Sequence, residues 1–75
     1  MLEYYTVSWS LHCQRAEEVL TDAGLAFTKI DLSDRAVFAA AARDLGFHRL
    51  PVLVGKDVFC EGLAQISKFV NHTNI

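Results

Sequence analysis

Apolar residues change their spacing several times along this chain, and each change marks a predicted element. Residues 2–7 are apolar on both faces, which is typical of a strand buried in the middle of a sheet. The next apolar positions recur with helical spacing, and Gly24 suits the left-handed end of that helix. Ser8 or Ser10 offers a side-chain oxygen that can cap its first turn. The apolar positions of this helix are Cys13, Ala16, Val19, Leu20 and Ala23.

The second half of the chain continues the alternation. Residues 26–31 predict a strand, and Ser33 is the expected cap of a second helix that ends at Gly46. Residues 50–54 and 58–60 flank a Gly-Lys-Asp turn, which indicates a short hairpin. A final helix follows Gly62. The expected inner positions of these two helices are Phe38, Ala41, Ala42 and Leu45, and Leu63, Ile66, Phe69 and Val70.

The resulting order, β-α-β-α-β-β-α, predicts an α/β fold. The first crossover must be right-handed and therefore gives a parallel pair of strands, and the hairpin adds two antiparallel strands. We expect a four-stranded mixed sheet with helices on both faces. No repeat, linker or low-complexity segment interrupts residues 1–75, so we expect one domain.

Composition narrows the functional classes. The chain has 75 residues, of which 52% are apolar and 21% charged, as in a folded globular domain. Its formal charge of −2 argues against nucleic acid as a partner. No segment approaches the roughly 20 apolar residues of a membrane span, and the N-terminus does not resemble a signal peptide. Two cysteines are too few for a disulfide scaffold, so we expect a reducing, cytoplasmic setting. We also expect a monomer.

Three local motifs carry a resemblance to a known family. Tyr5-Thr6, followed by Ser-Leu-His-Cys at 10–13, resembles a Tyr-Thr…Cys-x-x-Cys segment. Residues 46–54 resemble the approach to a cis-proline, and residues 60–63 stand where Trp-Ser-Gly-Phe is usual. Together with the element order, these motifs resemble the glutaredoxin branch of the thioredoxin superfamily, and NrdH-redoxins in particular. The resemblance implies the thioredoxin/glutaredoxin fold for the whole chain.

The resemblance also implies a function. NrdH-redoxins are small thiol–disulfide redoxins that reduce disulfides in proteins. The implied partner is ribonucleotide reductase, and thioredoxin reductase or glutathione is the implied reductant. No cofactor is implied other than glutathione as a co-substrate. Metal binding is not expected, because the cysteines are far apart in sequence and the histidines are scattered.

The chain departs from the family at three places. Ser10 stands where the family has its nucleophilic cysteine, Val7 where a Lys or Arg is usual, and Cys60 where the tryptophan is usual. Disulfide exchange begins with attack by a thiolate, so the chain as written keeps only the second, resolving cysteine of the motif. We therefore expect weak activity or none.

Three interpretations of Ser10 remain open from the sequence. The residue can be a helix cap that accepts a hydrogen bond from the amide of His12 or Cys13. It can be a Cys→Ser replacement that silences the site. It can also be a natural serine that donates a hydrogen bond to a bound thiolate.

The other motif residues also have two interpretations each. Cys13 lies on the apolar stripe of its helix, so we expect a shielded thiol that alkylates slowly, or simply a small buried side chain. His12 either tunes the environment of a nearby thiol or is an exposed residue of the first helical turn.

The resemblance places a substrate groove around Pro51. It implies a cis Leu50–Pro51 bond with the main chain of Leu50 offered to a peptide or to glutathione; the alternative is an ordinary proline at the start of an edge strand. Cys60, Glu61 and Gly62 are expected to close the groove. Gly62 offers bare amides for an anion, whereas Glu61 repels a carboxylate.

Two questions about this region stay open. Cys60 is either a half-buried strand residue or a second thiol within reach of the groove, and a bond to Cys13 requires Cα atoms within roughly 7 Å. The whole protein is either a redoxin, a non-catalytic module that binds glutathione or a peptide, or a structural domain. Residues 51–66 also resemble the glutathione-site half of transferase N-terminal domains.

Overall fold

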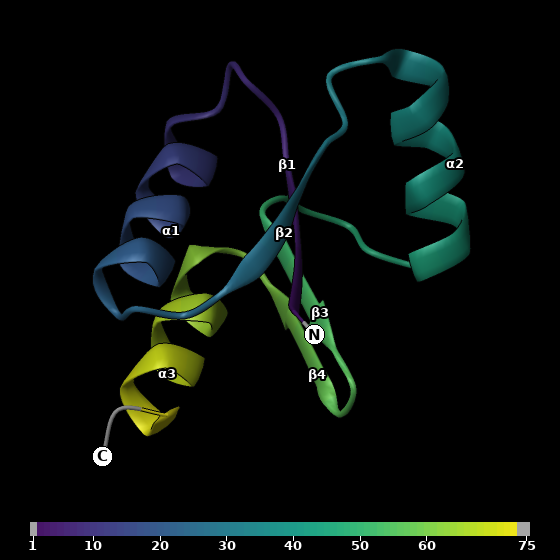
Figure 1. The fold of residues 1–75 in the computed structure, drawn as a ribbon. Coiled ribbons are helices and arrows are strands. Elements are labelled where there is room, and N and C mark those ends of the chain that lie inside the picture. Colours follow the sequence, from purple (N-terminus) through teal and green to yellow (C-terminus); the bar gives the residue numbers. More distant parts are fainter. Residues whose placement is uncertain (1, 74–75) are drawn as a thin grey trace.

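The computed structural model describes residues 2–73 and has the order β-α-β-α-β-β-α predicted from the sequence (Figure 1). Its four strands form one mixed sheet in the order β2-β1-β3-β4. β1 pairs in parallel with β2 and antiparallel with β3, and β3 pairs antiparallel with β4. The elements are β1 (Leu2–Thr6), α1 (Leu11–Asp22), β2 (Phe27–Asp31), α2 (Arg35–Leu45), β3 (Val52–Gly55), β4 (Val58–Glu61) and α3 (Leu63–Thr73).

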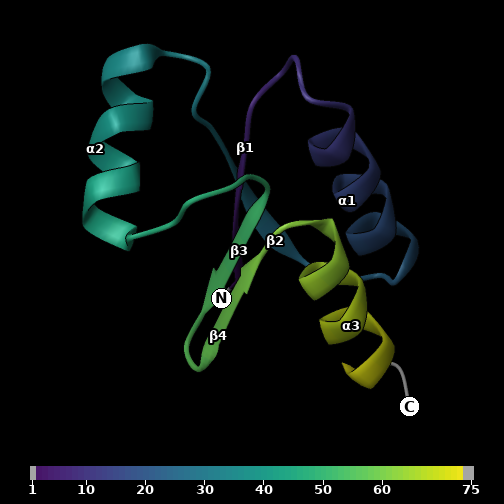
Figure 2. The same cartoon turned by 180° about the vertical axis from the view of Figure 1, so that it is seen from behind.

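Helices α1 and α3 cover one face of the sheet and α2 covers the other (Figures 1 and 2). Tyr4 is completely buried under the helix pair, and its ring meets Phe27 edge to face at 5.6 Å between centroids. The predicted stripes of α1 and α3 thus form this core. Its buried members are Tyr4, Ala16, Leu20, Leu53, Cys60, Ile66 and Val70.

The α2 face of the sheet is covered less completely. No residue of α2 is fully buried, and Phe38 packs edge to face against Phe47 at 5.8 Å. The partly buried positions of α2 include the predicted inner residues Phe38, Ala41, Ala42 and Leu45. The buried members of this second cluster are Val7, Cys13, Leu32, Phe47 and Val52.

The cap of α2 differs from the prediction. Asp34, and not Ser33, is the N-cap: its carboxylate accepts hydrogen bonds from the amides of Ala36 at 2.9 Å and Val37 at 3.2 Å. Ser33 is one residue too early to reach those amides and bonds to Asp31 instead. Gly46 ends the helix at φ 72°, the left-handed region that favours glycine.

Within residues 2–73, no helix is both long and apolar enough to cross a membrane.

Candidate functional site

Ser10 lies at the end of the β1–α1 loop and caps α1. Its backbone is extended (φ −98°, ψ 121°), and its hydroxyl oxygen accepts a hydrogen bond from the amide of Cys13 at 3.3 Å. This contact satisfies one of the amides that a helix leaves free in its first turn. The structure therefore shows Ser10 as a helix cap, which is one of the three interpretations that the sequence left open.

A second set of hydrogen bonds ties this loop to the start of α2. The hydroxyl of Ser33 donates to the carboxylate of Asp31 and accepts from the amide of Ser8 at 3.2 Å. The hydrogen bonds from Ser33 hold the pKa of Asp31 below its ordinary value. The loop in front of Ser10 is thus held by the side chain of Ser33 from the β2–α2 loop.

Cys13 points inward from the first turn of α1 and is completely buried. Its side chain packs with Val7, Leu32, Phe47 and Val52. The Tyr4 hydroxyl donates a hydrogen bond to the Cys13 carbonyl oxygen. Val7 is itself buried and brings no positive charge near the thiol. The expectation of a shielded Cys13 is confirmed.

A groove of about 680 Å³ lies beside this turn. His12 of α1 and Leu50 both line it, and the Leu50–Pro51 peptide bond is cis, as the resemblance implied. Pro51 itself is buried. The remaining lining residues are Arg49, Glu61, Gly62, Leu63, Ala64 and Gln65. The structure therefore brings His12, Leu50, Glu61 and Gly62 together next to Ser10 and Cys13.

Glu61 has a structural role in the groove that the sequence did not indicate. Its carboxylate accepts hydrogen bonds from the amides of His48 and of Arg49, the second at 2.9 Å. These amides stabilise the charged form, so the pKa of Glu61 lies below its ordinary value. The end of β4 thereby fixes the segment that leads into Leu50 and Pro51.

The amides of Glu61 and Gly62, directly before α3, are engaged within the protein. The Gly62 amide donates to the Pro51 carbonyl at 2.7 Å, and the Glu61 amide donates to the Gln65 side chain at 2.8 Å. Gly62 has φ +91°, and a Cβ there would lie 3.2 Å from Cδ of Arg49. The Gly62 amide is therefore not free for an anion, because the strand pairing of Pro51 continues into this residue. The amides of the first turn of α3, which follow it, have no partner within a helix.

Cys60 does not close the groove. It is only 8% exposed and packs in the cluster under α1 and α3, on the opposite side of β4 from Glu61. Alternation along the strand sends the two neighbours to different faces. Burial raises the pKa of the Cys60 thiol. Both cysteines are free thiols.

Some residues of the site were missed in the sequence. Arg49 lines the groove directly before Leu50, and its position next to the expected cis-proline was the available signal. Leu63 and Gln65 line the groove from the first turn of α3. Tyr4 looked like an ordinary core residue, and nothing in the sequence indicated its bond to Cys13.

Solved structures share this fold. One is NrdH-redoxin from Escherichia coli, a glutaredoxin-like protein with a thioredoxin-like activity profile. The match covers 95% of this chain and 91% of that protein, with 24% identity and a TM-score of 0.78. Another is glutaredoxin 1 from Francisella tularensis, complexed with cacodylate. The match covers 96% of this chain and 93% of that protein, with 14% identity and a TM-score of 0.83.

A third is a glutaredoxin–glutathione complex from buckwheat. The match covers 97% of this chain and 70% of the buckwheat protein, with 16% identity and a TM-score of 0.76. No family model and no curated protein matches the sequence. The structural likenesses show that the chain has the thioredoxin fold in its glutaredoxin-like form.

Burial predicts that Cys13 reacts slowly with a maleimide in the native protein, because its sulfur is reached only when the protein opens. Peptide mapping by mass spectrometry measures the labelling, and urea should accelerate it. Ser8→Cys is the matched control, since it puts a thiol at an exposed position of the same loop and should label rapidly. Native Cys13 labelling as fast as this control would contradict the buried geometry.

Acidification should release the bonds between Glu61 and the amides of His48 and Arg49. A carboxyl whose folded pKa is lowered stabilises the fold fully above its unfolded pKa of about 4.3, and this contribution is lost as the pH falls through the folded pKa. The amide chemical shifts of His48 and Arg49 should therefore titrate below that value. Glu61→Gln should abolish this titration and Glu18→Gln should leave it unchanged. A midpoint above the unfolded value would contradict the hydrogen bonding.

Proposed function

We propose that this chain is a redoxin-type protein that docks a polypeptide bearing a disulfide or a thiol beside cis-Pro51 but lacks thiol exchange of its own. The observation that supports the proposal is the arrangement of Ser10 and Cys13. The first motif position, at the N-cap of the helix that brings His12 to the groove, carries a hydroxyl, and the thiol one turn later is completely buried.

The chemistry follows from the two side chains. Exchange requires a thiolate that can reach a disulfide, and a serine hydroxyl neither ionises near neutral pH nor forms a disulfide. Ser10 is also engaged as the acceptor for the Cys13 amide. Cys13 has no access to the groove without local opening of the helix. The site can thus bind a polypeptide without exchanging thiols with it.

The remaining parts of a disulfide-reducing site are in place. A helix N-terminus at position 10, a resolving thiol at position 13 and a groove beside a cis-proline are what the glutaredoxin-like fold provides. In this proposal, only a form of the chain with a cysteine at position 10 would donate electrons to ribonucleotide reductase. Thioredoxin reductase or glutathione would then be its reductant.

Ser10→Cys should therefore create disulfide reductase activity. The new thiol would stand at the N-terminus of α1, where the helix dipole favours a thiolate, with Cys13 as the resolving thiol. The assay is reduction of insulin by dithiothreitol, which should be clearly faster with the variant than with the wild-type chain or without protein.

Ser8→Cys is the control for this assay, because it adds a thiol to the same loop at a position that does not cap the helix. It should not accelerate the reduction. Equal rates for the two variants, or no acceleration by either, would show that position 10 does not face a working site.

Glutathione is a second candidate ligand of the groove. His12 and Arg49 line the groove and could attract its carboxylates, and the buckwheat glutaredoxin with this fold is a complex with glutathione. Two features argue against glutathione. Glu61 is negatively charged, and the amides of Glu61 and Gly62 already donate hydrogen bonds within the protein. We therefore expect glutathione to bind poorly.

A titration of ¹⁵N-labelled protein with reduced glutathione tests this expectation. Wild-type protein should bind glutathione with a dissociation constant above about 10 mM, because the Glu61 carboxylate repels the carboxylates of glutathione. Glu61→Gln should bind more tightly, because it removes the charge and keeps an oxygen for the amides of His48 and Arg49. Millimolar or tighter binding by the wild-type chain would make glutathione the better candidate ligand.

A further inference from the structure

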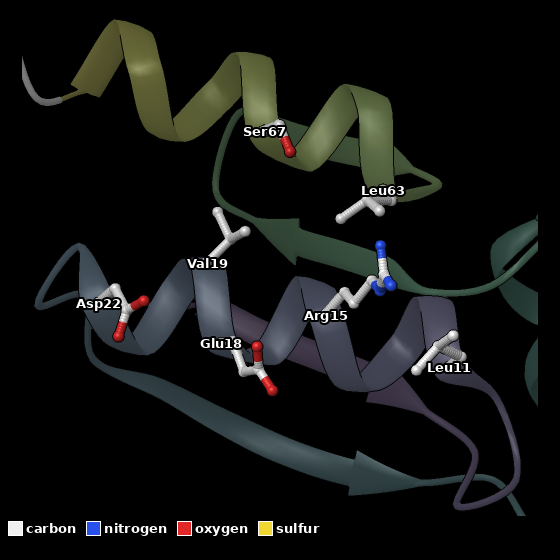
Figure 3. Close-up of a pocket in the computed structure, with 7 residues that line it drawn as sticks. All are labelled: Leu11, Arg15, Glu18, Val19, Asp22, Leu63 and Ser67. Carbon is white, nitrogen blue, oxygen red and sulfur yellow. The ribbon is translucent and has the colours of Figure 1, made fainter.

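The thiol of Cys13 is closed off from the hollows that open beside α1. The groove next to Pro51 is lined by His12, the neighbour of Cys13, but not by Cys13 itself. A cleft of about 600 Å³ between α1 and α3 is lined by Leu11 and Arg15 from the same end of the helix, again without Cys13 (Figure 3). A reagent therefore reaches the thiol only when the first turn of α1 moves.

Two side chains hold the backbone of Cys13 in this turn. The hydroxyl oxygen of Ser10 accepts a hydrogen bond from the Cys13 amide at 3.3 Å, and the hydroxyl of Tyr4 donates one to the Cys13 carbonyl oxygen. Ser10 directly precedes the helix and can move with it, whereas Tyr4 belongs to β1. The Tyr4 hydrogen bond therefore ties the first turn of α1 to the sheet.

The ring of Tyr4 has little freedom to follow a moving helix. It stands on β1, which is paired on both sides with β2 and β3. Its side chain is completely buried and meets the ring of Phe27 edge to face at 5.6 Å between centroids. Because side chains in such a core are closely packed, the hydroxyl keeps its position when α1 opens at this end.

The Tyr4 hydroxyl also keeps its proton. Burial and the neighbouring Cys13 raise the pKa of Tyr4 well above its ordinary value, and they outweigh the opposite effect of a hydrogen bond with Thr6. The phenol is thus a donor at every pH at which a thiol is normally tested. Opening of the turn breaks a buried hydrogen bond, which is more costly than breaking an exposed one.

We infer that Tyr4 is a positioning residue that keeps the thiol of Cys13 inside the protein by holding the Cys13 carbonyl. When the hydroxyl is present, the first turn of α1 opens rarely; without it, the turn opens more often and the thiol becomes accessible. This inference rests on the proposed function and deepens it, because it names the contact that keeps the remaining motif thiol unreactive.

A purely structural role for Tyr4 makes a different prediction. A core residue that contributes only to overall stability would affect Cys13 no more than any other core residue of equal contribution. A residue that holds the first turn affects Cys13 through local opening, which does not require the whole protein to unfold. The two roles are therefore distinguished by comparing variants that lose similar stability at different places.

Tyr4→Phe removes the hydroxyl and keeps the buried ring. It should raise the rate of maleimide labelling of Cys13 in the native protein about five- to tenfold, the change that corresponds to one net hydrogen bond. Peptide mapping by mass spectrometry separates Cys13 from Cys60, and circular dichroism checks that the variant is folded. Urea unfolding gives its overall stability.

Two controls accompany this variant. Tyr5→Phe removes a phenol hydroxyl from the next residue, which points to the other face of the sheet and lies 3.5 Å from the exposed carboxylate of Glu3. Val70→Ala shortens a buried side chain in the same core as Tyr4, and should lower the urea midpoint at least as much as Tyr4→Phe. Each control should change the labelling of Cys13 less than twofold.

Hydrogen exchange of one amide gives a second measure of the same opening. The Gln14 amide donates to the Ser10 carbonyl at 3.2 Å, so its exchange reports the first turn of α1. Tyr4→Phe should accelerate this exchange by about the same factor as the labelling. The Ala23 amide, which donates to the Val19 carbonyl at 3.1 Å at the other end of the helix, should change less than twofold.

Two results would overturn the inference. Labelling of Cys13 at the wild-type rate in Tyr4→Phe would show that the hydroxyl does not hold the turn. Equal acceleration by Tyr4→Phe and Val70→Ala would leave Tyr4 with a contribution to overall stability alone. These measurements need no cysteine at position 10 and no disulfide substrate, so the reductase assay of Ser10→Cys decides the proposed function separately.

Discussion

The site depends on how the first turn of α1 is fixed against the sheet. The side chain of Cys13 is buried among residues of the α2 face, while the Cys13 carbonyl accepts the Tyr4 hydroxyl from the core under α1 and α3. One residue is thus held from both sides of the sheet. Ser10, three residues before Cys13, is the N-cap of the helix and is partly exposed. This division between an outward and an inward position decides what chemistry the motif can perform.

The opposite wall of the groove rests on β4. Glu61 bonds to the amides of His48 and Arg49, and the Gly62 amide pairs with the Pro51 carbonyl. The cis-proline segment is therefore fixed by main-chain and carboxylate contacts that come from the same short strand. These contacts fix the shape of the groove before any ligand binds, and they use the amides of His48, Arg49 and Gly62 to do so.

The periodicity of apolar residues predicted the fold well, because each element buries one regular face. What it could not predict were contacts decided by one residue of register or by a side chain's choice of partner. Ser33 and Asp34 are both good caps, and only the path of the chain shows that Asp34 reaches the α2 amides. Cys60 and Glu61 were both expected to close the groove, and only Glu61 lines it, because alternation along β4 sends Cys60 into the core under α1 and α3. Ser10 and Cys13 were identified because their spacing is local.

The serine at position 10 changes what the rest of the site must supply. A redoxin with a nucleophile can hold its partner through a transient covalent bond, whereas a site with a serine must rely on contacts alone. Around Ser10 such contacts are available from exposed apolar side chains, because Trp9 and Leu11 stand on either side of it in the chain. In the proposed function, a docked polypeptide would meet these side chains together with the groove beside Pro51.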